Sequence, residues 1–123
     1  MAKNKILLVE DDLYLVKAIT IRLEANGFEV VAAIDGEEGL AKARSEKPDL
    51  IILDVMLPKM DGFVICRKLK IDKQYKDIPI IMLTAKFQPV DVRFGKAMGA
   101  DAYLTKPTDS KILLAKMKEL LKK

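Results

Sequence analysis

The sequence predicts one α/β domain built on a five-stranded parallel sheet with helices on both faces. Five apolar runs, each too short for a helix, recur along the chain, and each is followed by a stretch with helical spacing. Buried strands that alternate with amphipathic helices indicate a parallel sheet. Right-handed crossovers then favour the doubly wound strand orders, although the pattern alone does not choose between these orders.

The amino-terminal half supplies three of these strands. The first is the apolar run Ile6–Val9, and Asp12 can cap the helix that follows. Apolar positions at roughly helical spacing continue to the helix-ending Gly27; they are Leu13, Val16, Ile19, Ile21 and Leu23. The next three elements are a strand, a helix and a strand, at residues 28–33, 36–46 and 50–53.

The carboxy-terminal half completes the pattern. A loop over residues 56–62 leads into a third helix that extends to about Ile71. The fourth strand, residues 78–83, is entered through a proline, which is tolerated at a strand start. A helix over residues 89–98 and a strand over 102–104 follow. Thr108 or Asp109 caps the last helix, whose expected apolar stripe is Ile112, Leu113, Met117, Leu120 and Leu121.

Composition excludes several classes of function. The chain of 123 residues contains no histidine, which excludes Ser-His and Cys-His nucleophiles, histidine metal sites and a phosphohistidine donor. The single cysteine, Cys66, lies among apolar residues, so we expect it to be buried and free of disulfides. The formal net charge of +4 is weak evidence for nucleic acid. No apolar run is long enough for a signal peptide or membrane span, so we expect a soluble, cytoplasmic protein.

Polar residues gather where the predicted strands end. Glu10 and Asp11 follow the first strand, Asp54 the third, Thr84 the fourth and Lys106 the fifth. Because the carboxyl ends of parallel strands share one edge of the sheet, these side chains should converge. Oxygen ligands without histidine or cysteine favour a hard cation, Mg²⁺ above all. A carboxylate nucleophile, a hydroxyl, an ammonium and a cation together suit phosphoryl transfer.

Each of these residues has an ordinary alternative role. Asp54 is compatible with a cap, and Glu10 and Asp11 with acids that favour a helix N-terminus. Lys106 is compatible with a solvent-facing lysine, and Thr84 with a β-branched strand residue. Taken together, these alternatives require five independent coincidences at one edge of one sheet.

With these residues in these positions, the chain resembles the receiver domain of bacterial two-component response regulators along its whole length. The matching segments are residues 6–12, 48–62, 79–85 and 99–107, which read ILLVEDD, PDLIILDVMLPKMDG, PIIMLTA and GADAYLTKP. The resemblance implies a single receiver domain over residues 1–123. It also implies the flavodoxin-like strand order 2-1-3-4-5, the order that the chemotaxis member of this family exemplifies.

The resemblance assigns a role to each site residue. Asp54 would be the phosphorylated aspartate, and Glu10, Asp11 and Asp54 would hold Mg²⁺ together with the Met56 backbone carbonyl. Lys106 would pair with Asp54 and then with the phosphoryl group. The Met56 and Ala85 backbone N–H groups would cradle the phosphoryl oxygens.

The remaining roles concern neighbours of these residues. Asp12 is expected to cap a helix rather than to bind metal, and the Lys106–Pro107 bond to be cis. Thr84 and Tyr103 would form a switch that biases the surface of the fourth helix, fifth strand and fifth helix. Met56 and Lys86 would set the lifetime of the phosphorylated state.

The resemblance also implies partners. The phosphoryl donor would be a sensor histidine kinase or phosphotransfer protein, and the output a downstream protein target. The domain would catalyse its own phosphorylation and dephosphorylation. We expect a monomer, with dimerisation on phosphorylation as the alternative. No helix-turn-helix follows the last helix in this sequence, so we expect a stand-alone receiver without direct nucleic-acid or membrane contact; a piece of a larger regulator is the alternative. The basic residues Lys86, Arg93, Lys96 and Lys111 suit either an acidic partner or simple solvation.

Three competing functions remain to be weighed. A haloacid-dehalogenase-like phosphatase would need a second aspartate two residues after Asp54, where this chain has Met56. A nucleotide-binding protein would need a glycine-rich phosphate loop, and neither of the two common motifs occurs. An interaction module that uses the fold without phosphate is the third, and the intact set of site residues argues against it.

Overall fold

The structure, a computed structural model, describes residues 3–122. Its strands are β1 (Lys5–Val9), β2 (Glu29–Ala33), β3 (Leu50–Leu53), β4 (Ile80–Thr84) and β5 (Ala102–Thr105). Its helices are α1 (Leu13–Ala25), α2 (Gly36–Glu46), α3 (Gly62–Lys70), α4 (Pro89–Ala97) and α5 (Ser110–Leu121). Strands and helices therefore alternate as the sequence predicts.

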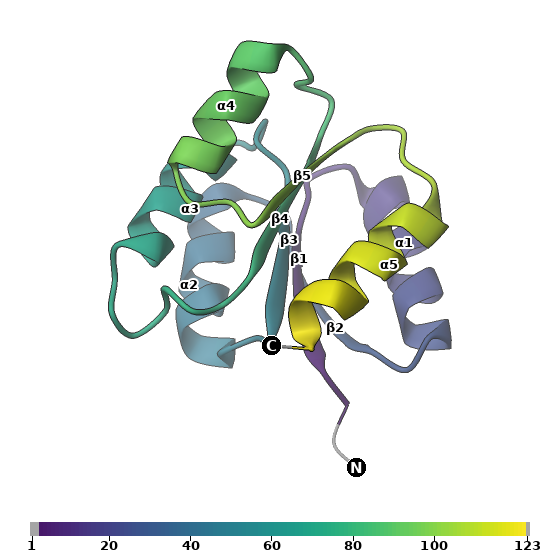
Figure 1. Ribbon diagram of the computed structural model, residues 1–123. Coiled ribbons are helices and arrows are strands. Elements are labelled where there is room, and N and C mark those ends of the chain that lie inside the picture. Colours follow the sequence, from purple (N-terminus) through teal and green to yellow (C-terminus); the bar gives the residue numbers. More distant parts are fainter. Residues whose placement is uncertain (1–2, 123) are drawn as a thin grey trace.

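The five strands form one parallel sheet in the order β2-β1-β3-β4-β5. Helices α1 and α5 cover one face, and α2, α3 and α4 cover the other (Figure 1). The expected doubly wound, flavodoxin-like class and strand order are thus confirmed. Among residues 3–122, no helix has both the length and the apolar character needed to cross a bilayer.

Alternate residues of the central strands build two separate cores. Leu7, Ile51 and Met82 belong to the core under α2 and α3, whereas Leu8 and Ile52 belong to the core under α1 and α5. Side chains point to opposite faces at successive strand positions, so a strand buried on both sides must be continuously apolar. This requirement explains the uninterrupted apolar runs of β1, β3 and β4.

Aspartates begin most of the helices. The Asp12 side chain accepts hydrogen bonds from the Tyr14 and Leu15 backbone N–H groups, which confirms it as the cap of α1. Asp109, rather than Thr108, caps α5 and accepts from the Lys111 N–H. Such caps satisfy N–H groups that the first helical turn leaves without partners.

The structure corrects several local predictions. Strand β4 begins at Ile80 and includes Thr84, not residues 78–83, because Pro79 lacks the N–H group that a ladder position requires. Ile112 is exposed and does not belong to the apolar stripe of α5. Its neighbour Leu113 is buried, together with Met117 one turn later, so the position next to Leu113 is rotated outward. Leu13 and Ile21 of α1 are exposed for the same reason.

Two backbone features lie at the edge of the sheet where the site residues gather. The Lys106–Pro107 bond is cis, as expected. Gly62 begins α3 directly against the backbone of β3, and a Cβ atom built there would lie 2.1 Å from the Asp54 carbonyl oxygen. Only glycine permits this close approach, which holds the loop after Asp54 against the end of its own strand.

Candidate functional site

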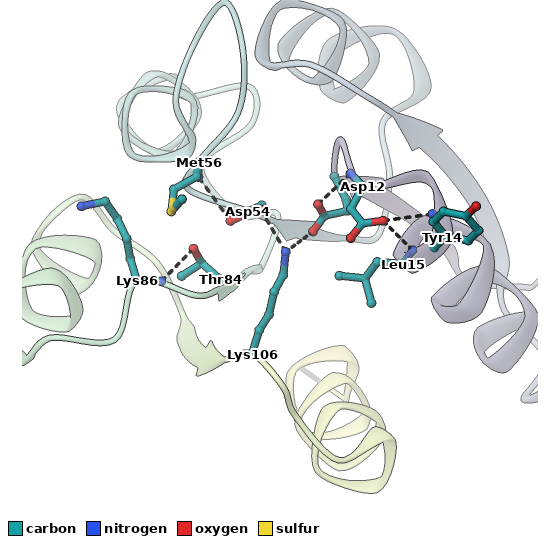
Figure 2. A network of polar contacts seen from close by, with 9 residues as sticks. Asp12, Tyr14, Leu15, Asp54, Met56, Thr84, Lys86 and Lys106 are labelled. Carbon is teal, nitrogen blue, oxygen red and sulfur yellow. Dashed lines mark hydrogen bonds and ion pairs between the residues drawn. The ribbon is translucent and has the colours of Figure 1, made fainter.

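Lys106 joins two buried carboxylates at the carboxyl edge of the sheet. Its Nζ donates a hydrogen bond to Asp54 Oδ2 at 3.0 Å (Figure 2). It donates a second hydrogen bond to Glu10 Oε1. Only 5% of Asp54 and 3% of Glu10 is exposed. Two carboxylates removed from water are stable beside each other only when a positive charge compensates them, and Lys106 supplies that charge.

The protonation equilibria reflect this burial. Burial raises the pKa of the Glu10 carboxyl above its ordinary value and outweighs the hydrogen bonds from Lys106 and the Asp12 N–H. Burial disfavours the charged form of Lys106 as well, but hydrogen bonds to Glu10 and Asp54 outweigh it and raise the pKa of the ammonium. Lys106 therefore stays charged at neutral pH.

The acidic residues also form a group that suits a metal ion. One carboxylate oxygen from each of Glu10, Asp11 and Asp54 lies within 4.8 Å of the other two. Asp11 is exposed, so solvent reaches the group from that side. The donors are all hard oxygens, and three carboxylates exceed the single charge of Lys106. The donor set therefore fits a hard divalent cation such as Mg²⁺.

The other predicted site residues lie around Asp54. The Met56 backbone N–H donates to Asp54 Oδ1 at 3.2 Å (Figure 2). Thr84 is the last residue of the neighbouring strand β4 and is 0% exposed. Its hydroxyl oxygen accepts a hydrogen bond from the Lys86 N–H at 3.3 Å. Ala85, exposed, follows at the start of the β4–α4 loop.

Tyr103 contacts the same loop from β5. Its hydroxyl donates to the Lys86 carbonyl at 2.6 Å, and burial raises its pKa to about 12. Its ring packs on α4, where a Cβ atom built on Gly95 would lie 2.8 Å from two ring carbons. Sequence reasoning missed Gly95, although a lone glycine inside an amphipathic helix is a signal of close packing.

A cavity opens beside the acidic group. It has a volume of about 590 Å³ and is lined on one side by Asp11, Met56 and Lys86. Phe63, at the start of α3, also lines the cavity. Asp11 of the acidic group and Val55, the residue that follows Asp54, therefore both border this cavity.

The strand order and the acidic edge define a doubly wound domain of the flavodoxin-like class, with its site where the strands end. Comparison with known protein families identifies the family within this fold class. Residues 6–118 match the response regulator receiver domain, and the chain belongs to this family. Its function is that of a phosphoacceptor domain in two-component signalling.

Individual relatives agree with this assignment. The chain is 46% identical over 120 residues to the alkaline phosphatase synthesis transcriptional regulatory protein PhoP of Bacillus subtilis, covering 98% of this chain and 49% of that protein. The chain thus spans about half the length of the curated relatives it matches.

Solved structures of receiver domains superpose closely. A CheY-like receiver domain protein of Methanospirillum hungatei has a TM-score of 0.92 at 35% identity, with 98% of this chain and 95% of that chain covered. The chemotaxis response regulator CheY4 of Vibrio cholerae has a TM-score of 0.89 at 37% identity, covering 97% and 99% respectively.

Proposed function

We propose that Asp54 is the phospho-acceptor of this receiver domain and that its donor is a phosphohistidine on a sensor histidine kinase or phosphotransfer protein. The observation that carries the proposal is the contact of Lys106 Nζ with Asp54 Oδ2 at 3.0 Å, on a carboxylate that is almost entirely buried. The contact orients the carboxylate and neutralises part of its charge before a negatively charged donor approaches.

Phosphoryl transfer to Asp54 would use one of its two carboxylate oxygens as the nucleophile. One oxygen would form the new bond to phosphorus while the phosphorus–nitrogen bond of the donor breaks, leaving its electron pair on the histidine nitrogen. Lys106 would then move its hydrogen bond to a phosphoryl oxygen. The backbone N–H groups of Met56 and Ala85 would donate to the same phosphoryl group. Water later hydrolyses the acyl phosphate, so the domain catalyses both its phosphorylation and its dephosphorylation.

Glu10, Asp11 and Asp54, with the Met56 carbonyl, would hold Mg²⁺. When bound, Mg²⁺ would neutralise charge on the phosphoryl oxygens. Both Glu10 oxygens already accept hydrogen bonds, from Lys106 and from the Asp12 N–H. Glu10 would therefore contribute mainly charge, and Asp11 the most accessible carboxylate.

The switch residues would couple this chemistry to the surface. Thr84 and Tyr103 contact the same β4–α4 loop, through the Lys86 N–H and the Lys86 carbonyl respectively. A phosphoryl group that draws the Thr84 hydroxyl towards itself would break its contact with the Lys86 N–H. The loop would then release or re-seat Tyr103 and alter the surface of α4, β5 and α5. Met56 and Lys86, beside the cavity, would set the phosphorylation lifetime.

The setting of this activity is part of the same proposal. Residues 1–123 would form one receiver domain that acts in the cytoplasm, as a monomer or, once phosphorylated, as a dimer. A buried, free cysteine suits a reducing compartment. The output would be binding of a downstream protein target through the α4, β5 and α5 surface.

Intact mass after incubation with acetyl phosphate tests the proposal. We expect one acid-labile phosphoryl group on the parent protein in the presence of Mg²⁺ and none in its absence. Asp54→Asn should take up none, whereas the matched control Asp77→Asn, an exposed aspartate remote from the site, should behave as the parent. Uptake by Asp54→Asn would overturn the assignment. No uptake by any protein would favour a phosphate-independent interaction module.

A further inference from the structure

A second apolar feature lies outside the site, in a groove between α3 and α4. The groove has a volume of about 320 Å³. Phe63 and Val64 of α3 form one wall, and Phe94 and Met98 from the region of α4 form the other. The Phe63 and Phe94 rings meet edge to face with centroids 4.9 Å apart, so the two helices lie side by side, as Figure 1 shows.

The groove leaves apolar surface in contact with water. Val64 is 40% exposed and Phe94 48% exposed. Val90 lies four positions before Phe94 on the same face of α4 and is exposed as well. Phe87, also exposed, lies in the loop just before this helix. Single exposed apolar residues are ordinary, but a continuous apolar line beside a hollow is typical of a surface that binds another molecule.

Cations dominate the two helices that form the groove. Arg67 and Lys68 lie on its rim, and both are exposed. No salt bridge between the described residues includes either of them. Helix α3 has no acid, and the acid of α4, Asp91, pairs with Lys86 at 3.6 Å. Asp61, the cap of α3, is the one acid among the residues that line the groove, so Arg67 and Lys68 leave the lining with a net positive charge.

These properties select among the molecules that could cover the groove. A second copy placed face to face would bring Arg67 and Lys68 against the same cations, because a two-fold interface is self-complementary. A flat lipid surface cannot fill a hollow between two helices. No strand edge borders the groove, so an occupant must satisfy its own backbone hydrogen bonds, as a helix does.

We infer that the α3–α4 groove binds an acidic amphipathic helix of a partner protein, whose apolar side chains insert beside Val64 and Phe94 and whose carboxylates pair with Arg67 and Lys68. This is recognition of a helix in a groove. The position of the groove links it to the site, because Asp61 and Phe63 line both the groove and the cavity beside Asp54. The inference does not depend on phosphoryl transfer at Asp54.

Fluorescence anisotropy with a designed peptide tests the inference. The probe is a fluorescein-labelled helical peptide with leucines along one face and glutamates at the flanking positions. We expect saturable binding to the full chain. Val64→Ser should weaken the Kd about tenfold or more by removing an apolar wall, and Lys68→Glu should do the same by reversing the rim charge.

Matched variants keep the test specific. Ile21→Ser removes an exposed apolar side chain from α1, and Lys118→Glu reverses an exposed charge on α5. Both should bind the probe as the parent does, and circular dichroism should show all four variants folded. A probe with lysines in place of glutamates should not bind.

Four outcomes would overturn the inference. They are absence of binding to the parent, equal losses in the groove and control variants, equal binding of the lysine probe, and self-association that Val64→Ser abolishes. Sedimentation of the parent with vesicles of phosphatidylcholine and phosphatidylserine covers the lipid alternative. If the parent sediments with the vesicles, Val64→Ser does not, and the peptide does not bind, the groove binds lipid instead of a partner helix.

Discussion

The Tyr103 hydroxyl donates a hydrogen bond to the Lys86 main-chain carbonyl at 2.6 Å and thereby ties β5 to the loop between β4 and α4. The same loop residue donates its N–H to Thr84. The Lys86 backbone therefore connects the buried Thr84 hydroxyl on β4 with the Tyr103 hydroxyl on β5.

Replacing Tyr103 with phenylalanine should separate the ring from its hydrogen bond. The ring still packs on Gly95, so the fold should persist, with the free energy of unfolding lower by about 1 kcal/mol for the lost hydrogen bond. Amide exchange at Lys86 and its neighbours should become faster. Urea denaturation and hydrogen exchange measure both effects. Tyr14→Phe, at an exposed tyrosine, is the control. Equal effects of the two changes would show that the Tyr103 hydrogen bond does not stabilise the β4–α4 loop.

Mg²⁺ should stabilise the protein in the absence of any phosphodonor. The carboxylates of Glu10, Asp11 and Asp54 repel one another, and a cation that binds only the folded state raises stability by about 2.7 kcal/mol at a hundredfold excess over its Kd. Thermal unfolding with and without Mg²⁺ measures this shift, which Asp11→Asn should largely abolish.

Asp12→Asn is the matched control for the metal experiment. Asparagine caps a helix about as well as aspartate, so this variant should keep both its stability and its response to Mg²⁺. A lost response in Asp12→Asn would move the metal site from Asp11 towards the helix cap.

Gly62→Ala should be far more damaging than Gly27→Ala. A Cβ atom at Gly62 would lie 2.1 Å from the Asp54 carbonyl oxygen, so the backbone after Asp54 must shift. Gly27 has a φ of +88° but nothing within 4 Å of a built Cβ, so its replacement should cost only about 1–2 kcal/mol. We expect a loss of at least about 3 kcal/mol for Gly62→Ala, together with impaired phosphorylation. Urea denaturation compares the two, and equal costs would contradict the close approach.

Cys66 should make stability fall at alkaline pH. Burial raises the pKa of its thiol to about 11. Between about pH 9 and pH 11 the unfolded chain releases the thiol proton while the folded protein retains it, so the unfolded state is favoured as the pH rises. The full effect is on the order of 3 kcal/mol and is absent below the unfolded pKa.

The difference between the parent and Cys66→Ala isolates this contribution from that of Tyr103, whose raised pKa acts in the same direction. Urea denaturation from pH 7 to pH 11 measures it. The folded parent should also resist alkylation by iodoacetamide at pH 8. Parallel stability curves for the two proteins would contradict the burial argument.

Local patterns in the sequence determined the elements and the edge on which the site lies. Continuous apolar runs such as Ile6–Val9 predict buried parallel strands, and the polar residues that follow them must then share an edge. Asp12 was recognisable as a cap from its place before an apolar periodic stretch. These inferences need only short-range periodicity, which the chain carries within each βα unit. The order 2-1-3-4-5 came from family resemblance, because periodicity does not rank the crossovers.

Only the tertiary structure decided which side chains meet. Lys106 contacts Glu10 across 96 positions of sequence, and Gly95 admits the Tyr103 ring, because sheet order and helix placement bring distant segments together. The exposure of Ile112 and the contact between the Phe63 and Phe94 rings depend likewise on how each helix packs against the sheet and the neighbouring helices. Periodicity specifies which residues prefer burial, but packing in three dimensions selects their partners, and the α3–α4 groove exists only at that level.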